Sequence, residues 1–197
     1  MKLAFLASNN GSSMRAIVAA IRTGELDAEA RLIVSNKKDA PALSFARENG
    51  ISALHIPTMK DEAGADSALS EALARAGATH VVLSGYLRKL GPKTLSAFQG
   101  RILNVHPALL PKFGGQGFYG RRVHEAVVAA REAMTGVTIH LVDGEYDHGP
   151  VVAQFTIPVS ANDSAEDVER KVVAAEPGFF VDTLKRLVSG EIVLQIP

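Results

Sequence analysis

The chain has 197 residues, of which 47% are apolar, 21% charged and 6% aromatic. This length and composition predict one α/β domain over residues 1–197. Lysine plus arginine (21) equals aspartate plus glutamate (21), so no overall charge favours a nucleic acid or an anionic membrane as partner. The sequence has no cysteine, which excludes disulfides, thiolate zinc sites and thiol nucleophiles. No stretch resembles a signal peptide or a membrane span, and we expect a cytoplasmic protein.

Apolar runs alternate with amphipathic segments through the first half of the chain. The patterns predict strands at 3–7, 31–34, 52–56 and 80–83, with helices beginning near 14, 41 and 66 between them. Asp39 is the expected N-cap of the second helix, because Pro41 follows it in the first turn. Such an alternation is typical of βα units.

The second half continues the pattern with one long interruption. The sequence predicts strands at 102–106, 135–142 and 151–159, a helix at 123–131, and two helical stretches between Asp163 or Ser164 and Gly190. The last two strands are expected to pair as an antiparallel hairpin. Residues 107–120 contain too many prolines and glycines for regular structure and indicate a functional loop.

These elements together predict a doubly wound, mostly parallel Rossmann-like sheet of about seven strands with helices on both faces. In such folds ligands bind beyond the carboxyl ends of the strands, near the point where the strand order reverses. The first candidate site there is Ser8–Ser13, which leads from a strand into a helix and offers backbone N–H groups to a phosphate. An ordinary helix cap is the alternative interpretation.

A dinucleotide is disfavoured at the same place. The loop lacks the G-x-G-x-x-G pattern, and the second strand ends in Ser35-Asn36-Lys37-Lys38 instead of an acidic residue. The alternative from another class of enzyme is an oxidoreductase, in which Lys37 and Lys38 hold the 2′-phosphate of NADP.

The second candidate site is the end of the fifth strand. Asn104 and His106 lie on the same side of that strand, where an amide donor and an imidazole could stabilise an oxyanion in acyl chemistry. Asp147 is the expected carboxylate partner and would raise the pKa of His106. A histidine that is merely buried and satisfied by the backbone is the alternative.

Other chemistries have weaker signals. The acids of the turn 143–147 do not match a calcium loop, because the glycine is one place late and Gln154 stands where a glutamate should be. The remaining histidines, including His140, show no metal-ligand spacing and are expected to be structural or exposed. No serine lies in a G-x-S-x-G elbow. We therefore predict no metal and no side-chain nucleophile.

The run Asn104-Val105-His106-Pro107 followed by Asp147-His148-Gly149-Pro150 resembles the signature of the folate-dependent formyltransferases. The similarity extends over nearly the whole chain and is greatest to the purine-pathway branch of that family. It implies formyl transfer from 10-formyltetrahydrofolate, the co-substrate, to the amine of glycinamide ribonucleotide. A related formyltransferase or formyl-folate hydrolase with another acceptor, and a binding domain without activity, are the alternatives.

The resemblance also implies roles for particular residues. Asn104, His106 and Asp147 would be the catalytic residues, and Asp147 would keep His106 protonated. The ribonucleotide is bound by Gly11, Ser12, Ser13 and Glu176, and the folate by Leu87, Arg88, Lys89, Leu90, Asn104, Asp143, Gly144, Glu145, Tyr146 and Asp147. The part of the chain up to about residue 100 would then bind the phosphate, and the part from about 101 to 197 would bind the folate. The protein would be a monomer or a homodimer.

Three positions depart from the family pattern. Ser13 stands where the family usually has asparagine, and Ala108 replaces a serine. Pro177 replaces a histidine after Glu176 and is expected to interrupt or restart the helix. In addition, the segment 57–74 contains no arginine for the folate tail.

Overall fold

Strands and helices alternate along the chain, as the sequence predicts. The computed structural model describes residues 1–194, which form six helices and seven strands. In chain order these are β1 (Lys2–Leu6), α1 (Ser12–Arg22), β2 (Glu29–Ser35), α2 (Pro41–Glu48), β3 (Ser52–His55), α3 (Glu62–Arg75), β4 (His80–Leu83), α4 (Pro92–Ala97), β5 (Ile102–His106), α5 (Arg121–Ala129), β6 (Met134–Leu141), β7 (Val151–Pro158) and α6 (Ala165–Val188). The predicted end of the domain, residues 195–197, lies outside the described part.

The seven strands form one sheet in the order β3-β2-β1-β4-β5-β6-β7. Strands β1 to β5 are parallel, whereas β6 is antiparallel to both β5 and β7. The doubly wound sheet and the antiparallel hairpin are therefore confirmed. The chain winds outward from β1 to β3 and then returns to place β4 on the other side of β1. In doubly wound sheets ligands bind outside the carboxyl ends of the strands at such a reversal, which here lies between β1 and β4.

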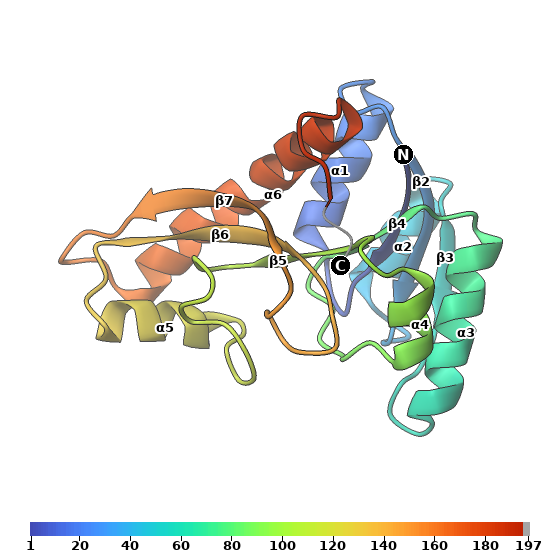
Figure 1. Cartoon of the computed structure of the whole chain (residues 1–197), viewed down its shortest axis with the longest axis horizontal. Helices are drawn as coiled ribbons and strands as arrows, with labels where there is room; N and C mark the ends of the chain where they lie inside the picture. Colours follow the sequence, from blue (N-terminus) through green and yellow to red (C-terminus); the bar gives the residue numbers. More distant parts are fainter. Residues whose placement is uncertain (195–197) are drawn as a thin grey trace.

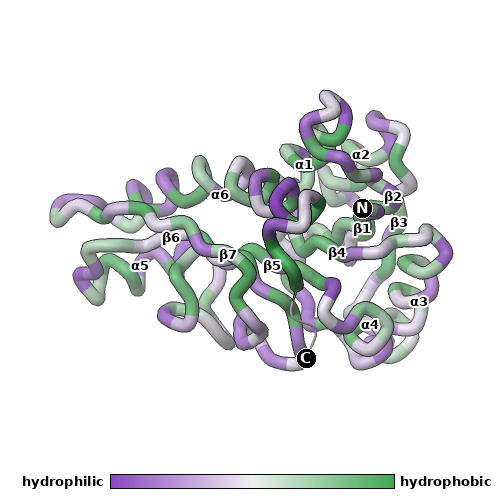
Figure 2. The backbone as a smooth tube through the Cα atoms, turned by 45° about the horizontal axis from the view of Figure 1, so that its top comes forward, coloured by the Kyte–Doolittle hydropathy of each residue, from purple (hydrophilic) through white to green (hydrophobic). Residues whose placement is uncertain are grey.

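Helices cover both faces of the sheet. Alternate residues of β1 enter two different cores: Leu3 and Phe5 pack with apolar residues of α1, α2 and α6, whereas Ala4 and Leu6 pack with those of α3. All four side chains are fully buried. Along the backbone, the hydrophobic colour gathers in the central strands and the hydrophilic colour in the connecting turns (Figure 2).

The β6–β7 hairpin extends away from the rest of the sheet together with α5 and the first part of α6 (Figure 1). A separate core holds this half, in which Val127 of α5 packs against Val137, Ile157, Val168 and Val172. Within residues 1–194 no helix combines the length and apolar character that crossing a membrane requires.

Three details of the first half differ from the sequence predictions. Ala40, not Asp39, is the N-cap of α2, although Pro41 occupies the first turn as expected. Helix α3 starts at Glu62 because the Asp61 side chain accepts the Gly64 N–H at 2.8 Å. The short helix α4 was not predicted. Its first amides are satisfied by the distant Asp66, which no local pattern reveals.

The predicted interruption at Pro177 is wrong, because α6 continues through it from Ala165 to Val188. A capping box between Ser164 and Asp167 starts this helix, so Ser164 is the cap. A proline removes the N–H that would bond the carbonyl four residues earlier, which belongs to Val173. Because Val173 is 51% exposed, water can satisfy that carbonyl and the helix tolerates the proline.

Candidate active site

The residues predicted to carry chemistry meet at the carboxyl edge of the sheet. The loop 7–11 follows β1, the loop 84–91 follows β4, and His106 is the last residue of β5. The connection between β6 and β7 reaches the same edge, since Asp147 contacts His106. The structure therefore places the site beside the reversal of strand order, where the sequence predicted it.

His106 is 3% exposed and has a partner on each ring nitrogen. Its Nε2 lies 2.7 Å from the Phe113 carbonyl oxygen and donates to it, while Nδ1 lies 3.4 Å from Asp147 Oδ2. Burial lowers the pKa of His106, and the opposing effects of the Asp147 charge and the Phe113 carbonyl do not offset it. Asp147 therefore raises the pKa of His106, as expected, but burial lowers it more, so the net shift of this pKa is downward.

Asp147 remains ionised in this setting. Burial would raise the pKa of Asp147, but the neighbouring His140 and His106 rings and the Gly115 N–H together lower it. The Gly115 amide donates to Asp147 Oδ2 at 3.0 Å. Asp147 has a backbone φ of 54°, a conformation that aspartate adopts more readily than most residues. The turn thus presents a carboxylate between two imidazoles.

The third predicted catalytic residue, Asn104, contacts a histidine that the sequence analysis set aside. His140 lies directly opposite Asn104 in the β5–β6 ladder, and its Nε2 is 3.0 Å from Asn104 Nδ2. The same Nε2 is 3.5 Å from Asp147 Oδ1. His140 is therefore a site residue that sequence reasoning missed, because its role depends on the register between two strands.

A second cluster joins the start of α1 to the middle of α6. Gly11 is the N-cap of α1 in the left-handed conformation, with φ 66°, and as a glycine it makes no side-chain capping hydrogen bond. Ser13 is buried and donates its hydroxyl to Glu176 Oε1 at 2.5 Å. Burial raises the pKa of Glu176, although the Ser13 hydrogen bond acts in the opposite direction. The structure thus brings together residues 11–13 and Glu176, while Ser12 stays exposed.

Two buried serines tie these loops to one another. The Ser8 hydroxyl accepts the Leu87 N–H at 2.8 Å and donates to Asn36 Oδ1 at 2.7 Å. The Ser84 hydroxyl accepts the Met14 N–H at 3.0 Å. The ends of β1, β2 and β4 and the start of α1 are therefore held in a fixed relation.

The predicted folate loops lie beside each other at the rim. The Lys89 ammonium lies 5.9 Å from the centre of the Tyr146 ring, which connects the loop after β4 to the turn 143–147. Leu87 is exposed there, whereas Leu90 is 7% exposed and packs into the core of the α3 face. Asp143 accepts the Glu145 N–H at 2.8 Å, which shapes the turn.

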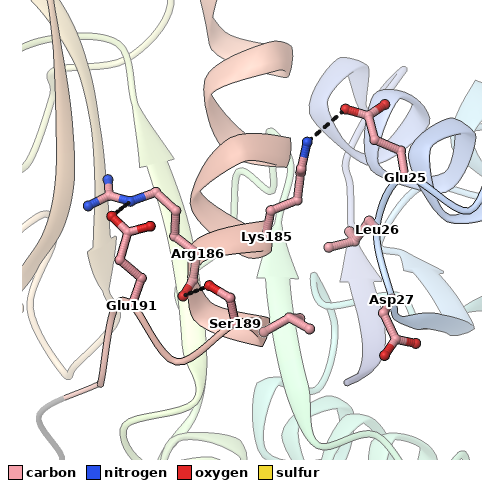
Figure 3. A pocket seen from close by; sticks show the side chains of 8 residues that line it. Glu25, Leu26, Asp27, Lys185, Arg186, Ser189 and Glu191 are labelled. Carbon is pink, nitrogen blue, oxygen red and sulfur yellow. Dashed lines mark hydrogen bonds and ion pairs between the residues drawn. The ribbon is translucent and has the colours of Figure 1, made fainter.

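A cavity of about 450 Å³ lies elsewhere, between the α1–β2 connection and the end of α6 (Figure 3). Two ion pairs lie in its lining, Lys185 with Glu25 and Arg186 with Glu191. Because residues 25–27 precede β2, this cavity lies at the amino ends of the strands, opposite the candidate site. Among residues 1–194 no cluster of three or more histidine or acidic side chains could hold a metal ion.

Comparison with known proteins assigns the family. Residues 1–184 match the family model described as "Formyl transferase". The chain therefore belongs to the formyl transferase family, as its motifs predicted. This assignment replaces the alternative of an NADP-dependent oxidoreductase.

Within that family the chain is similar to proteins named phosphoribosylglycinamide formyltransferase. It is 39% identical to the chloroplastic one of Vigna unguiculata over 98% of its own length, and spans 62% of that protein. It is 33% identical to that of Bacillus subtilis, with 94% of each chain covered. The solved glycinamide ribonucleotide transformylase 1 of Symbiobacterium toebii has 30% identity and a TM-score of 0.89, with 99% of this chain and 91% of that chain covered. The chain thus spans less than two thirds of the plant relative and nearly all of the bacterial ones.

Proposed function

We propose that this chain transfers the formyl group of 10-formyltetrahydrofolate to the amine of glycinamide ribonucleotide, a step of purine biosynthesis. The names of the relatives support this assignment. The observation that carries it is the contact of Asp147 with His106 at 3.4 Å, beside the Asn104 amide. This set offers hydrogen-bond donors and a carboxylate, which suits a reaction whose nucleophile is the amine of the substrate.

The first step forms one bond and moves one electron pair. The amine nitrogen attacks the formyl carbon, and the carbonyl electron pair moves onto oxygen to give a tetrahedral oxyanion. Asn104 and His106 donate N–H groups to that oxygen. Donors placed where negative charge develops stabilise the transition state more than the substrate.

The second step returns the proton and releases the folate. The attacking nitrogen gives up a proton, and Asp147 accepts it through a water molecule. The oxyanion electron pair re-forms the carbonyl double bond as the bond between the formyl carbon and N10 breaks. N10 takes up the proton that Asp147 accepted, which yields formylated ribonucleotide and tetrahydrofolate. Asp147 suits this role because its pKa is lowered and it enters the reaction as a carboxylate.

The Phe113 carbonyl in the loop 111–120 must release the His106 N–H before this N–H can bind the formyl oxygen. In the structure the His106 Nε2–H is directed to the Phe113 carbonyl. Phe113 has φ 56°, and Gly114, Gly115 and Gly117 are its neighbours in the loop. We expect the formyl oxygen to replace the Phe113 carbonyl as the acceptor from His106.

Binding of the two substrates uses the two clusters described above. The backbone of Gly11, Ser12 and Ser13 at the start of α1 would hold the phosphate, and Glu176 the ribose or the amine-bearing part. The loops 87–90 and 143–147 would enclose the pterin. Residues of about 1–100 then serve mainly the ribonucleotide and those of about 101–197 the folate, in a cytoplasmic monomer or homodimer.

The experiment that tests this function supplies the purified protein with both substrates and quantifies tetrahydrofolate, formylated ribonucleotide and formate by mass spectrometry. We expect one formylated ribonucleotide per tetrahydrofolate and no formate. Formate released without the ribonucleotide would instead identify a hydrolase. Absence of the formylated product while folate binds would refute the proposed acceptor.

A further inference from the structure

His140 is a buried titratable residue to which the proposed reaction gives no role. Its side chain is 2% exposed, and it faces the site from β6. Its Nδ1 lies 2.8 Å from the Leu141 carbonyl oxygen. A carbonyl only accepts, so Nδ1 carries the proton and donates it. In the neutral ring Nε2 is then left with a lone pair.

That lone pair points at the Asn104 amide. Nε2 and Asn104 Nδ2 are 3.0 Å apart, so the amide nitrogen donates to the ring. The reverse orientation would turn the Asn104 carbonyl oxygen toward a second lone pair, which is repulsive. The amide nitrogen has two hydrogens, and holding one on His140 leaves the other for the formyl oxygen.

A chain of two hydrogen bonds thus runs through the ring: the Asn104 amide donates to His140 Nε2, and His140 Nδ1 donates to the Leu141 carbonyl. We infer that His140 is a positioning residue for the proposed reaction, which fixes the orientation of the Asn104 amide so that its free N–H meets the oxyanion. This inference rests on the proposed function. The ladder between β5 and β6 pairs residues 104 and 140 directly, which brings the imidazole to the Asn104 amide.

The charged groups around His140 define when this arrangement holds. Asp147 Oδ1 lies 3.5 Å from Nε2, and the His106 ring and the Asp143 carboxylate also act on His140 electrostatically. If Nε2 gains a proton, the ring donates to Asp147 and no longer accepts from Asn104. The orienting contact therefore belongs to the neutral ring.

Two substitutions distinguish the roles of the two ring nitrogens of His140. In His140→Asn, the short amide reaches only as far as Nδ1 and can still donate to Leu141. In His140→Gln, the longer amide reaches as far as Nε2 and can present a carbonyl oxygen to Asn104. We expect His140→Asn to lower kcat about tenfold, with both KM values within about twofold of the wild type, because one net hydrogen bond is lost. His140→Gln should recover most of kcat.

A double-mutant cycle tests whether His140 acts through Asn104. The combination of Asn104→Ala with His140→Asn should be no slower than Asn104→Ala alone. Additive losses, or equal losses in His140→Asn and His140→Gln at unchanged thermal stability, would overturn the inference.

The ring itself offers a measurement that requires no variant and no turnover. Long-range proton–nitrogen NMR of the wild-type protein should find the neutral His140 ring protonated on Nδ1, and a neutral ring protonated on Nε2 would overturn the inference even if every variant folds poorly. A wild-type protein that forms no formylated ribonucleotide would refute the proposed function instead. The tautomer result would then still report whether the Asn104 contact exists.

Discussion

Replacing Asp147 with asparagine removes a negative charge from between two imidazoles while keeping the shape of the side chain. The carboxylate lies 3.4 Å from His106 Nδ1 and 3.5 Å from His140 Nε2. Its contact with the Gly115 N–H, at 3.0 Å, needs only an acceptor oxygen, which asparagine retains. We therefore expect the loop and the fold to survive the substitution.

The size of the effect follows from the distance. At 3.4 Å, a unit positive charge on His106 and the carboxylate attract by about 5 kcal/mol at an effective dielectric constant of about 20. About half of a unit charge on the ring in the transition state corresponds to about 2–3 kcal/mol. The kcat of Asp147→Asn should accordingly fall by roughly 100-fold.

The assay compares kcat and thermal unfolding of the wild type, Asp147→Asn and Asp182→Asn. Asp182 is an exposed carboxylate on α6, so its substitution makes the same charge change away from the site and should leave kcat within about twofold. The Asp147 charge opposes the burial that lowers the pKa of His106, so the His106 titration seen by NMR should move to lower pH. A loss of less than about threefold in a folded Asp147→Asn protein would refute this role of the carboxylate.

Three further predictions follow from other contacts. The pKa of His106 is lowered in the folded protein, so as the pH falls the unfolded chain binds a proton at this residue first, and the free energy of unfolding falls below about pH 6.5. Urea unfolding at about pH 8 and about pH 5.5 should show a smaller decline of this free energy for His106→Gln than for the wild type. An identical decline would contradict this prediction. Asp66→Ala should lower the free energy of unfolding by about 2–3 kcal/mol, because Asp66 accepts two backbone N–H groups at the start of α4 at 2.8 and 3.0 Å; a change below about 0.5 kcal/mol in the urea midpoint analysis would speak against it. Glu176→Gln should raise the KM for the ribonucleotide about tenfold and leave the KM for the folate unchanged, because the Ser13 hydrogen bond holds Glu176 beside the start of α1. Steady-state kinetics that find the opposite pattern would show that Glu176 does not belong to the ribonucleotide site.

The local pattern of the chain was sufficient for most of the architecture. Alternating apolar runs and helical periodicity predicted every strand of the sheet and all helices except α4, because burial of one face leaves a periodic signal in the sequence. Helix α4 has no such signal, since its start depends on Asp66, a residue of another helix. Pro177 gave a misleading local signal, because its effect depends on whether the freed carbonyl can meet water.

The residue types of the candidate site were also readable in advance, but not their environment. The sequence by itself determined that Asn104 and His106 share one side of a strand and that the family motif includes Asp147. Only the tertiary structure decided that burial outweighs Asp147 in setting the pKa of His106, and that the register of β5 with β6 places His140 against the Asn104 amide. Periodicity is a property of neighbours along the chain, whereas desolvation and cross-strand contacts depend on which distant segments pack together.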